Sequence, residues 1–130
     1  MKVGFTGTQI GMSDHQKEQF VLKLYDLGVT EFHHGDCIGA DEEAHDIVRE
    51  FFPDVKIHIH PPKYENKRAF KVGDVMYAQD DYIPRDRKIV DSTEFLIGAP
   101  KSNKEELRSG TWTTIRHARK TYKPLSILDR

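Results

Sequence analysis

His33-His34-Gly35-Asp36-Cys37-Ile38-Gly39-Ala40-Asp41 is the stretch around which the fold of this chain is organised. Residues 29–32 before it are partly β-branched, which favours a strand, and residues 42–52 after it have helical spacing. A strand that passes through a glycine turn into a helix presents free backbone N–H groups, and the helix dipole adds partial positive charge there. The turn is therefore suited to an anion, commonly a phosphate.

Within this turn, we expect Gly35 and Gly39 to allow a positive φ or a close backbone approach. We expect Asp41 to cap the following helix by accepting a hydrogen bond from an amide one turn on. The plain alternative is a tight connection with an ordinary cap, because a single glycine turn is a weak signal. The turn alone leaves both interpretations open.

Strand and helix patterns alternate along the rest of the chain. Residues 61–80 are polar and without a period, so we expect a long loop that holds one short turn of helix. Expected strands are residues 2–6, 29–32, 55–60, 94–98 and 124–128, and expected helices run from Ser13 to Gly28, over residues 42–52 and 81–91, and from Ser109 onward.

Several side chains are assigned to a face by this spacing. His58 and His60 fall on what we expect to be the solvated side of an amphipathic strand near the sheet edge. Helical side chains expected to face inward are Phe20, Leu22, Leu24, Tyr25, Leu27, Ile115, Ala118 and Tyr122.

The composition limits the function classes. Lys and Arg total 20 against 21 acidic residues, so the net charge of -1 gives no reason to expect general, phosphate-driven nucleic-acid binding. One cysteine cannot form an internal disulfide, and residues 1–6 lack the pattern of a signal peptide, so we expect a cytoplasmic protein. No apolar run approaches the ~20 residues that cross a bilayer.

The alternation predicts one α/β domain over residues 1–130, with a mainly parallel sheet of about five strands and helices on both faces. In such sheets, ligands bind beyond the carboxyl ends of the strands, where the strand order reverses. Glycine turns at residues 6–11, 35–41 and 98–111 would meet along that edge. Together they predict a site for a nucleotide or phosphorylated sugar.

With these turns, the chain resembles the SLOG superfamily of Rossmann-like proteins, which includes LOG phosphoribohydrolases and DprA/Smf and YpsA/YspA-like proteins. It is most similar to the small YspA-like nucleotide-binding branch. The resemblance covers almost the whole chain and rests on Phe5-Thr6-Gly7-Thr8, the Gly35 to Asp41 turn, Pro84-Arg85-Asp86-Arg87-Lys88-Ile89-Val90-Asp91 and Ser109-Gly110-Thr111.

The resemblance implies a pocket for a nucleotide-derived ligand and a homodimer. Phosphate is expected on the Gly110 turn, with Arg85 or Arg87 near the ribose or phosphate. The expected ligand-binding residues are Gly7, Thr8, Gly35, Asp36, Gly39, Ala40, Asp41, Arg85, Ser109, Gly110 and Thr111.

The chain departs from the LOG enzymes at the catalytic position. Those enzymes have Pro-Gly-Gly before the last turn and a Glu after it, where this chain has Arg108-Ser109 and Thr114. A hydroxyl cannot replace a carboxylate as a base. The alternative function, hydrolysis of a nucleotide N-glycosidic bond, would therefore use Asp36, Asp86, Arg87 or a residue of the long loop over residues 61–80. A DprA-like single-stranded DNA module is the third possibility.

The sequence predicts neither a cofactor nor a metal site. His33, His34, Asp36, Cys37 and His45 are close in sequence, but they lack the paired cysteines or fixed His spacing of a zinc site.

Overall fold

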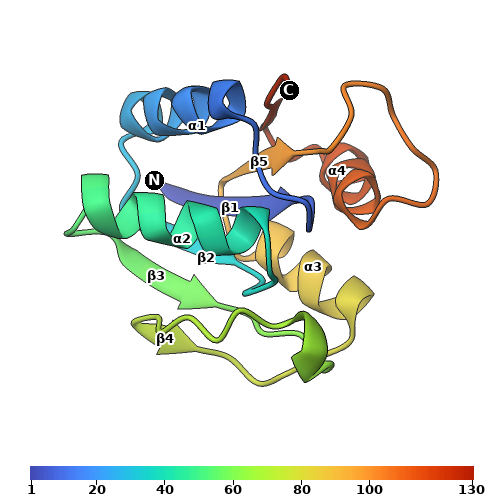
Figure 1. The fold of residues 1–130 in the computed structure, drawn as a ribbon, viewed down its shortest axis with the longest axis horizontal. Helices are drawn as coiled ribbons and strands as arrows, with labels where there is room; N and C mark the ends of the chain where they lie inside the picture. The colour runs from blue at the N-terminus through green and yellow to red at the C-terminus, as the bar shows by residue number, and fades with distance from the viewer.

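Six parallel strands form the sheet of the computed structural model, which describes residues 1–130 (Figure 1). Their order is β4-β3-β2-β1-β5-β6, so the strand order reverses between β1 and β5. This is a single α/β domain. The strands are β1 (Lys2–Gly7), β2 (Glu31–His34), β3 (Lys56–Ile59), β4 (Val75–Met76), β5 (Phe95–Ala99) and β6 (Leu125–Ile127).

Four helices cover the sheet, two on each face (Figure 1). They are α1 (Asp14–Leu27), α2 (Ala40–Phe51), α3 (Tyr82–Asp91) and α4 (Gly110–Lys120). Neighbouring residues of β5 contribute to different faces of the sheet, because successive strand side chains point in opposite directions. Ile97 belongs to the main core with α1 and α2, whereas Leu96 packs with Val90 of α3 and Ala118 of α4.

The main core is built around three phenylalanines from β1, α1 and β2. Phe5, Phe20 and Phe32 contact one another with ring centroids 5.3 to 5.9 Å apart. All three are at most 1% exposed. Their packing fixes α1 against the sheet and so positions the turn that follows β1.

The inward stripe of α1 differs from the predicted one. Leu22 and Tyr25 are 68% and 78% exposed, while Gln16 is fully buried and donates to Pro100 O and Leu128 O. A polar residue can occupy the stripe because two backbone carbonyls satisfy its amide. Tyr122 was also expected to face inward, but it follows α4 with φ 58° and is 92% exposed.

The loop over residues 61–80 is more ordered than its sequence indicates. It contains the expected short helical turn, a 3-10 helix (Glu65–Lys67), and also β4, which pairs with β3 and adds the sixth strand. Two residues are too few to give a readable period.

This extension also changes the surroundings of the β3 histidines. The predicted solvated face is wrong, because His60 is only 2% exposed and the Tyr77 ring stacks on it at 4.1 Å between centroids. The side chain of His58 is 12% exposed.

The structure contains no helix with the length and hydrophobicity of a membrane span.

Candidate ligand-binding cavity

A cavity of about 580 Å³ lies at the carboxyl ends of β1, β2 and β5, where the strand order reverses. Residues from all three predicted turns line it, together with the start of α3. The structure therefore brings the three turns together at one cavity. The sequence-predicted residues on its wall are Gly7, Thr8, Gly35, Asp41, Arg85, Asp86, Ser109, Gly110 and Thr111.

The turn after β1 is fastened to its neighbours by backbone hydrogen bonds. The carbonyl of Thr8 accepts from the amides of Gly11 and Ala40, and the amide of Thr8 donates to Ala99 O at 3.1 Å. Gly39 has φ +91°, and a Cβ on it would overlap the backbone of Gln9. Glycine at this position allows the second turn to pack directly against the first.

The N-terminus of α4 forms the opposite wall. Ser109 Oγ accepts from Trp112 N at 3.2 Å and so caps the helix. The amides of Gly110 and Thr111 donate to no acceptor within the chain. Free amides and the positive end of the helix dipole suit an anion at this wall.

Arg85 lies in the cavity wall and is largely buried, with 5% exposure. Its Nη1 donates to Gly35 O and to His60 O, and its Nε lies 2.8 Å from Asp86 Oδ1. A Cβ on Gly35 would overlap this guanidinium. Arg85 thus shapes the turn after β2, and Asp86 balances much of its charge.

Two carboxyl groups with raised pKa values line the cavity. Burial raises the pKa of Asp41 to about 7, against the opposing charge of Arg85, and burial also raises the pKa of Asp86. Asp41 Oδ1 is buried without a hydrogen-bond partner, while Oδ2 accepts from Cys37 N at 3.1 Å. Near neutral pH, Asp41 can therefore donate a proton or a hydrogen bond into the cavity.

Asp41 was expected to cap α2, and this expectation is wrong. The cap position is Gly39, which makes no side-chain hydrogen bond, and Asp41 is the second residue of the helix. Its carboxylate accepts from the amide of Cys37, which lies before the helix. Burial raises the pKa of the Cys37 thiol to about 11, which favours the thiol over the nucleophilic thiolate.

Four predicted site residues do not line the cavity. The buried carboxylate of Asp36 accepts from Arg68 Nε at 2.9 Å and Lys71 N at 3.0 Å, so it anchors the loop over residues 61–80. Gly39 and Ala40 lie behind the wall and brace the turn after β1. Arg87 points to a second hollow, between α3 and α4.

Four polar side chains on the cavity wall were missed by the sequence analysis, and one of them, Glu106, is an acid whose Oε2 lies 3.7 Å from Lys101 Nζ. Lys101 and Arg108 bring exposed cationic side chains from the segment between β5 and α4, and Tyr82 comes from the first turn of α3. The Arg85 guanidinium lies 5.4 Å from the Tyr82 ring centroid. Arg108 directly precedes the Ser109-Gly110 turn, and this adjacency was the available signal.

Comparisons with known proteins establish the fold. No protein-family model and no curated protein sequence matches this chain. A solved structure described as a molybdenum cofactor binding protein from the phototrophic bacterium Rippkaea orientalis matches with TM-score 0.73 and 17% identity, covering 100% of this chain and 78% of that chain. The structural genomics target TM1055 matches with TM-score 0.66 and 19% identity, covering 96% and 72%. The chain has a Rossmann-like fold.

Proposed function

We propose that this chain is a SLOG-type protein that binds a nucleotide or a nucleotide-derived phosphate ligand in the cavity at the β1 and β5 ends. One observation carries the proposal: the backbone amides of Gly110 and Thr111, at the N-terminus of α4 on the cavity wall, donate to no acceptor within the chain. Exposed Arg108 adds positive charge at the same wall, where Lys101 is paired with Glu106. An anionic group is the ligand chemistry that these donors recognise.

The size and position of the cavity support the same proposal. Its volume of about 580 Å³ is within the range of small-molecule sites. It also lies at the reversal of strand order, where ligands of open α/β sheets bind. A structural neighbour described as a molybdenum cofactor binding protein supports a small-molecule ligand for this fold.

The test is the Gly110→Asp variant, with Gly110→Asn as its matched control. A Cβ at Gly110 meets nothing within 4 Å, so both variants should fold. The Asp carboxylate would repel a phosphate at the α4 N-terminus, and the Asn amide would not. Calorimetry with AMP, ADP-ribose and NAD should show at least about tenfold weaker binding for Gly110→Asp than for Gly110→Asn. Equal affinities, or no binding of any anionic nucleotide by the wild type, would contradict the proposal.

Hydrolysis of an N-glycosidic bond is a second candidate function, and the carboxyl groups of the cavity favour it. Asp86 lies beside Thr114, the position of the LOG catalytic Glu, and also lines the cavity. Asp41, with its raised pKa, could act as the acid. Release of free base from the same nucleotides, lost in Asp86→Asn, would establish this activity, and binding without turnover would reject it.

A further inference from the structure

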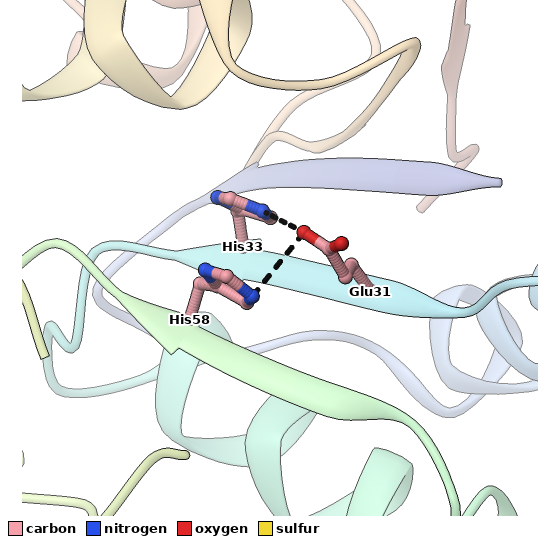
Figure 2. Close-up of side chains that lie close together, drawn as sticks. All are labelled: Glu31, His33 and His58. Atoms are coloured by element: carbon pink, nitrogen blue, oxygen red, sulfur yellow. Dashed lines mark hydrogen bonds and ion pairs between the residues drawn. The ribbon is translucent and has the colours of Figure 1, made fainter. Parts of the chain in front are cut away.

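The side chains of Glu31, His33 and His58 converge on the face of the sheet that α3 also covers (Figure 2). They come from β2 and β3, to one side of that helix. Glu31 and His33 are two residues apart on β2, so their side chains share a face. His58 lies directly opposite His33 on β3. Two positions on one strand and one on its neighbour form a rigid base for three side chains.

The distances within this cluster, which we call the Glu31 cluster, suit a shared metal ion. Glu31 Oε1 lies 3.2 Å from His33 Nε2 and 3.2 Å from His58 Nε2. Ligand atoms bound to one Zn²⁺ at about 2.0 to 2.2 Å are themselves about 3 Å apart. The two imidazole rings stack at 4.2 Å with 14° between their planes, so binding requires them to tilt toward each other.

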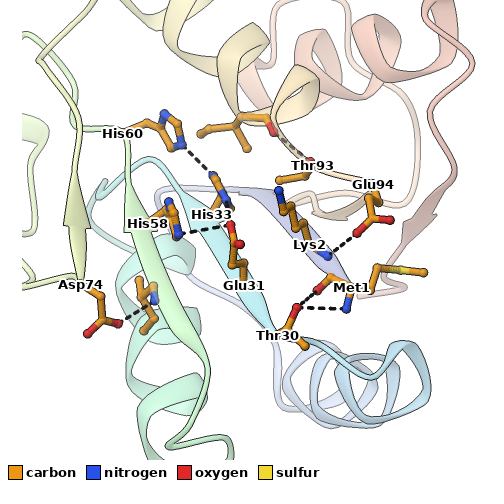
Figure 3. Close-up of polar contacts among 12 residues, drawn as sticks. Met1, Lys2, Thr30, Glu31, His33, His58, His60, Asp74, Thr93 and Glu94 are labelled. Atoms are coloured by element: carbon orange, nitrogen blue, oxygen red, sulfur yellow. Dashed lines mark hydrogen bonds and ion pairs between the residues drawn. The ribbon is translucent and has the colours of Figure 1, made fainter.

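Each imidazole of the Glu31 cluster has a partner on its other ring nitrogen. His33 Nδ1 lies 2.9 Å from His60 Nε2, as Figure 3 shows, and His58 Nδ1 lies 2.9 Å from the Tyr77 hydroxyl. Without a metal, each Nε2 lies 3.2 Å from the Glu31 carboxylate, which only accepts, so a neutral ring donates from Nε2. Because His60 and Tyr77 can each donate or accept, the proton can move to Nδ1 when a metal binds. With the proton on Nδ1, each Nε2 has its lone pair free for a metal, which is the arrangement of metal-binding histidines.

Burial and charge leave the Glu31 cluster accessible from one side. The side chain of His33 is 2% exposed, whereas that of Glu31 is 26% exposed. Lys2 lies opposite Glu31 on β1 and is exposed, and its positive charge competes with a bound cation. An ion can therefore enter past the partly exposed Glu31, toward two largely buried imidazoles.

We propose that Glu31, His33 and His58 bind one divalent transition-metal ion of the Zn²⁺ class. Two imidazole nitrogens and one carboxylate oxygen are a ligand set for such ions. Three protein ligands leave at least one coordination position for water or another small ligand. This site is separate from the nucleotide cavity, whose wall includes none of the three residues.

The test uses the purified full chain after treatment with a chelator. Zn²⁺ binding is measured by calorimetry, and Co²⁺ binding by the visible absorption of the bound ion. The wild type should bind one ion per chain, with Co²⁺ bands typical of nitrogen and oxygen ligands. Glu31→Gln keeps the size of a partly exposed side chain and should weaken binding at least about tenfold. Lys2→Met removes the competing charge and should strengthen it.

The matched control is His117→Gln. His117 pairs with Asp91 at 3.1 Å on the surface, but no third ligand joins them. This variant and Gly110→Asp should bind Zn²⁺ as the wild type does. The absence of a saturable one-to-one site, unchanged affinity in Glu31→Gln, or an equal loss in His117→Gln would overturn the proposal. Thermal melts of every variant without metal check that the fold is kept.

Discussion

Gly35 and Arg85 lie together at the cavity, and the position of the Arg85 guanidinium leaves room only for glycine at residue 35. The sequence predicted both at a ligand, Gly35 for its backbone freedom and Arg85 through the family resemblance. In the structure, Arg85 Nη1 donates to Gly35 O and occupies the space that a Cβ on Gly35 would need. The residue types were therefore readable from the sequence, but their contact, which spans 50 positions of the chain, was not.

Asp41 should make the proposed nucleotide binding depend on pH. Its pKa is raised to about 7 by burial, so its carboxyl is neutral below that pH and anionic above it. Affinity for an anionic ligand should therefore fall as the pH rises through about 7, by about tenfold between pH 6 and pH 8.5. ADP-ribose is a suitable probe, because its pyrophosphate keeps a constant charge over this range. The measurement is calorimetry at both pH values.

The Asp41→Asn variant isolates this effect from the other groups that face the cavity. Asp86 also has a raised pKa, and Arg85 and Arg108 carry positive charge there. In Asp41→Asn these groups are retained, so the affinity should change much less over the same pH range. If the variant keeps the full pH dependence of the wild type, Asp41 is not its source.

At the scale of elements, the strand and helix patterns could be predicted, while side-chain partners could not. The period of α1 indicated a helix, yet Gln16 rather than Leu22 or Tyr25 lies on its buried side. Gln16 is buried because carbonyls of residues 100 and 128, distant in sequence, accept from its amide. Hydropathy along one helix carries no information on such partners.

The loop over residues 61–80 depends on the buried carboxylate of Asp36. Asp36→Asn replaces a charged acceptor with an amide. Arg68 then loses its counter-ion, and the NH₂ of the amide faces one of the two donors, Arg68 Nε or Lys71 N, that the carboxylate accepts from. We expect this change to lower the free energy of unfolding by about 1.5 to 3 kcal/mol. Asn tolerates the φ of 54° at this position, so backbone strain does not add to the loss.

Urea unfolding measures this loss. Hydrogen exchange of the Lys71 amide, which donates to Asp36 Oδ1, should become faster, and so should that of the Ala69 amide, which donates to the Asp36 backbone carbonyl, as the loop loosens. The matched control is Asp46→Asn, because Asp46 pairs with Lys71 Nζ at the surface and its side chain is 59% exposed. That change should cost less than about 0.5 kcal/mol. Equal losses in the two variants would contradict an anchoring role for Asp36.

For the molecule as a whole, the position of the cavity was predictable because topology decides it. Alternating elements imply a parallel sheet, and a reversal of strand order leaves a crevice at the strand ends. The Glu31 cluster was not predictable, because it depends on the register of β2 against β3 and on Tyr77 beyond β4. Period-2 spacing assigns His58 to a face without telling which strand and loop lie beside it.

The stability of the whole domain should decrease in mild acid because of a histidine in its interior. Burial, followed by the charge of His45, holds the pKa of His34 well below its usual value. His34 Nδ1 accepts from Asp36 N at 2.9 Å, so the neutral ring that donates from Nε2 to His45 Nδ1 is the form that the fold stabilises. The unfolded chain takes up this proton below about pH 6.5, whereas the folded chain does not.

Between about pH 6.5 and the lower pKa of the folded state, His34 alone should cost about 1.4 kcal/mol of stability for each pH unit. His34→Asn preserves an acceptor near Nδ1 but removes a buried ring, so its free energy of unfolding should be lower at pH 7.5. Because Asn cannot titrate, this free energy should also fall less steeply as the pH is lowered. Urea unfolding at pH 7.5, 6 and 5 measures both slopes. His15→Asn, at an exposed position of α1, should keep the wild-type slope. An unchanged slope in His34→Asn would assign the acid sensitivity to other groups.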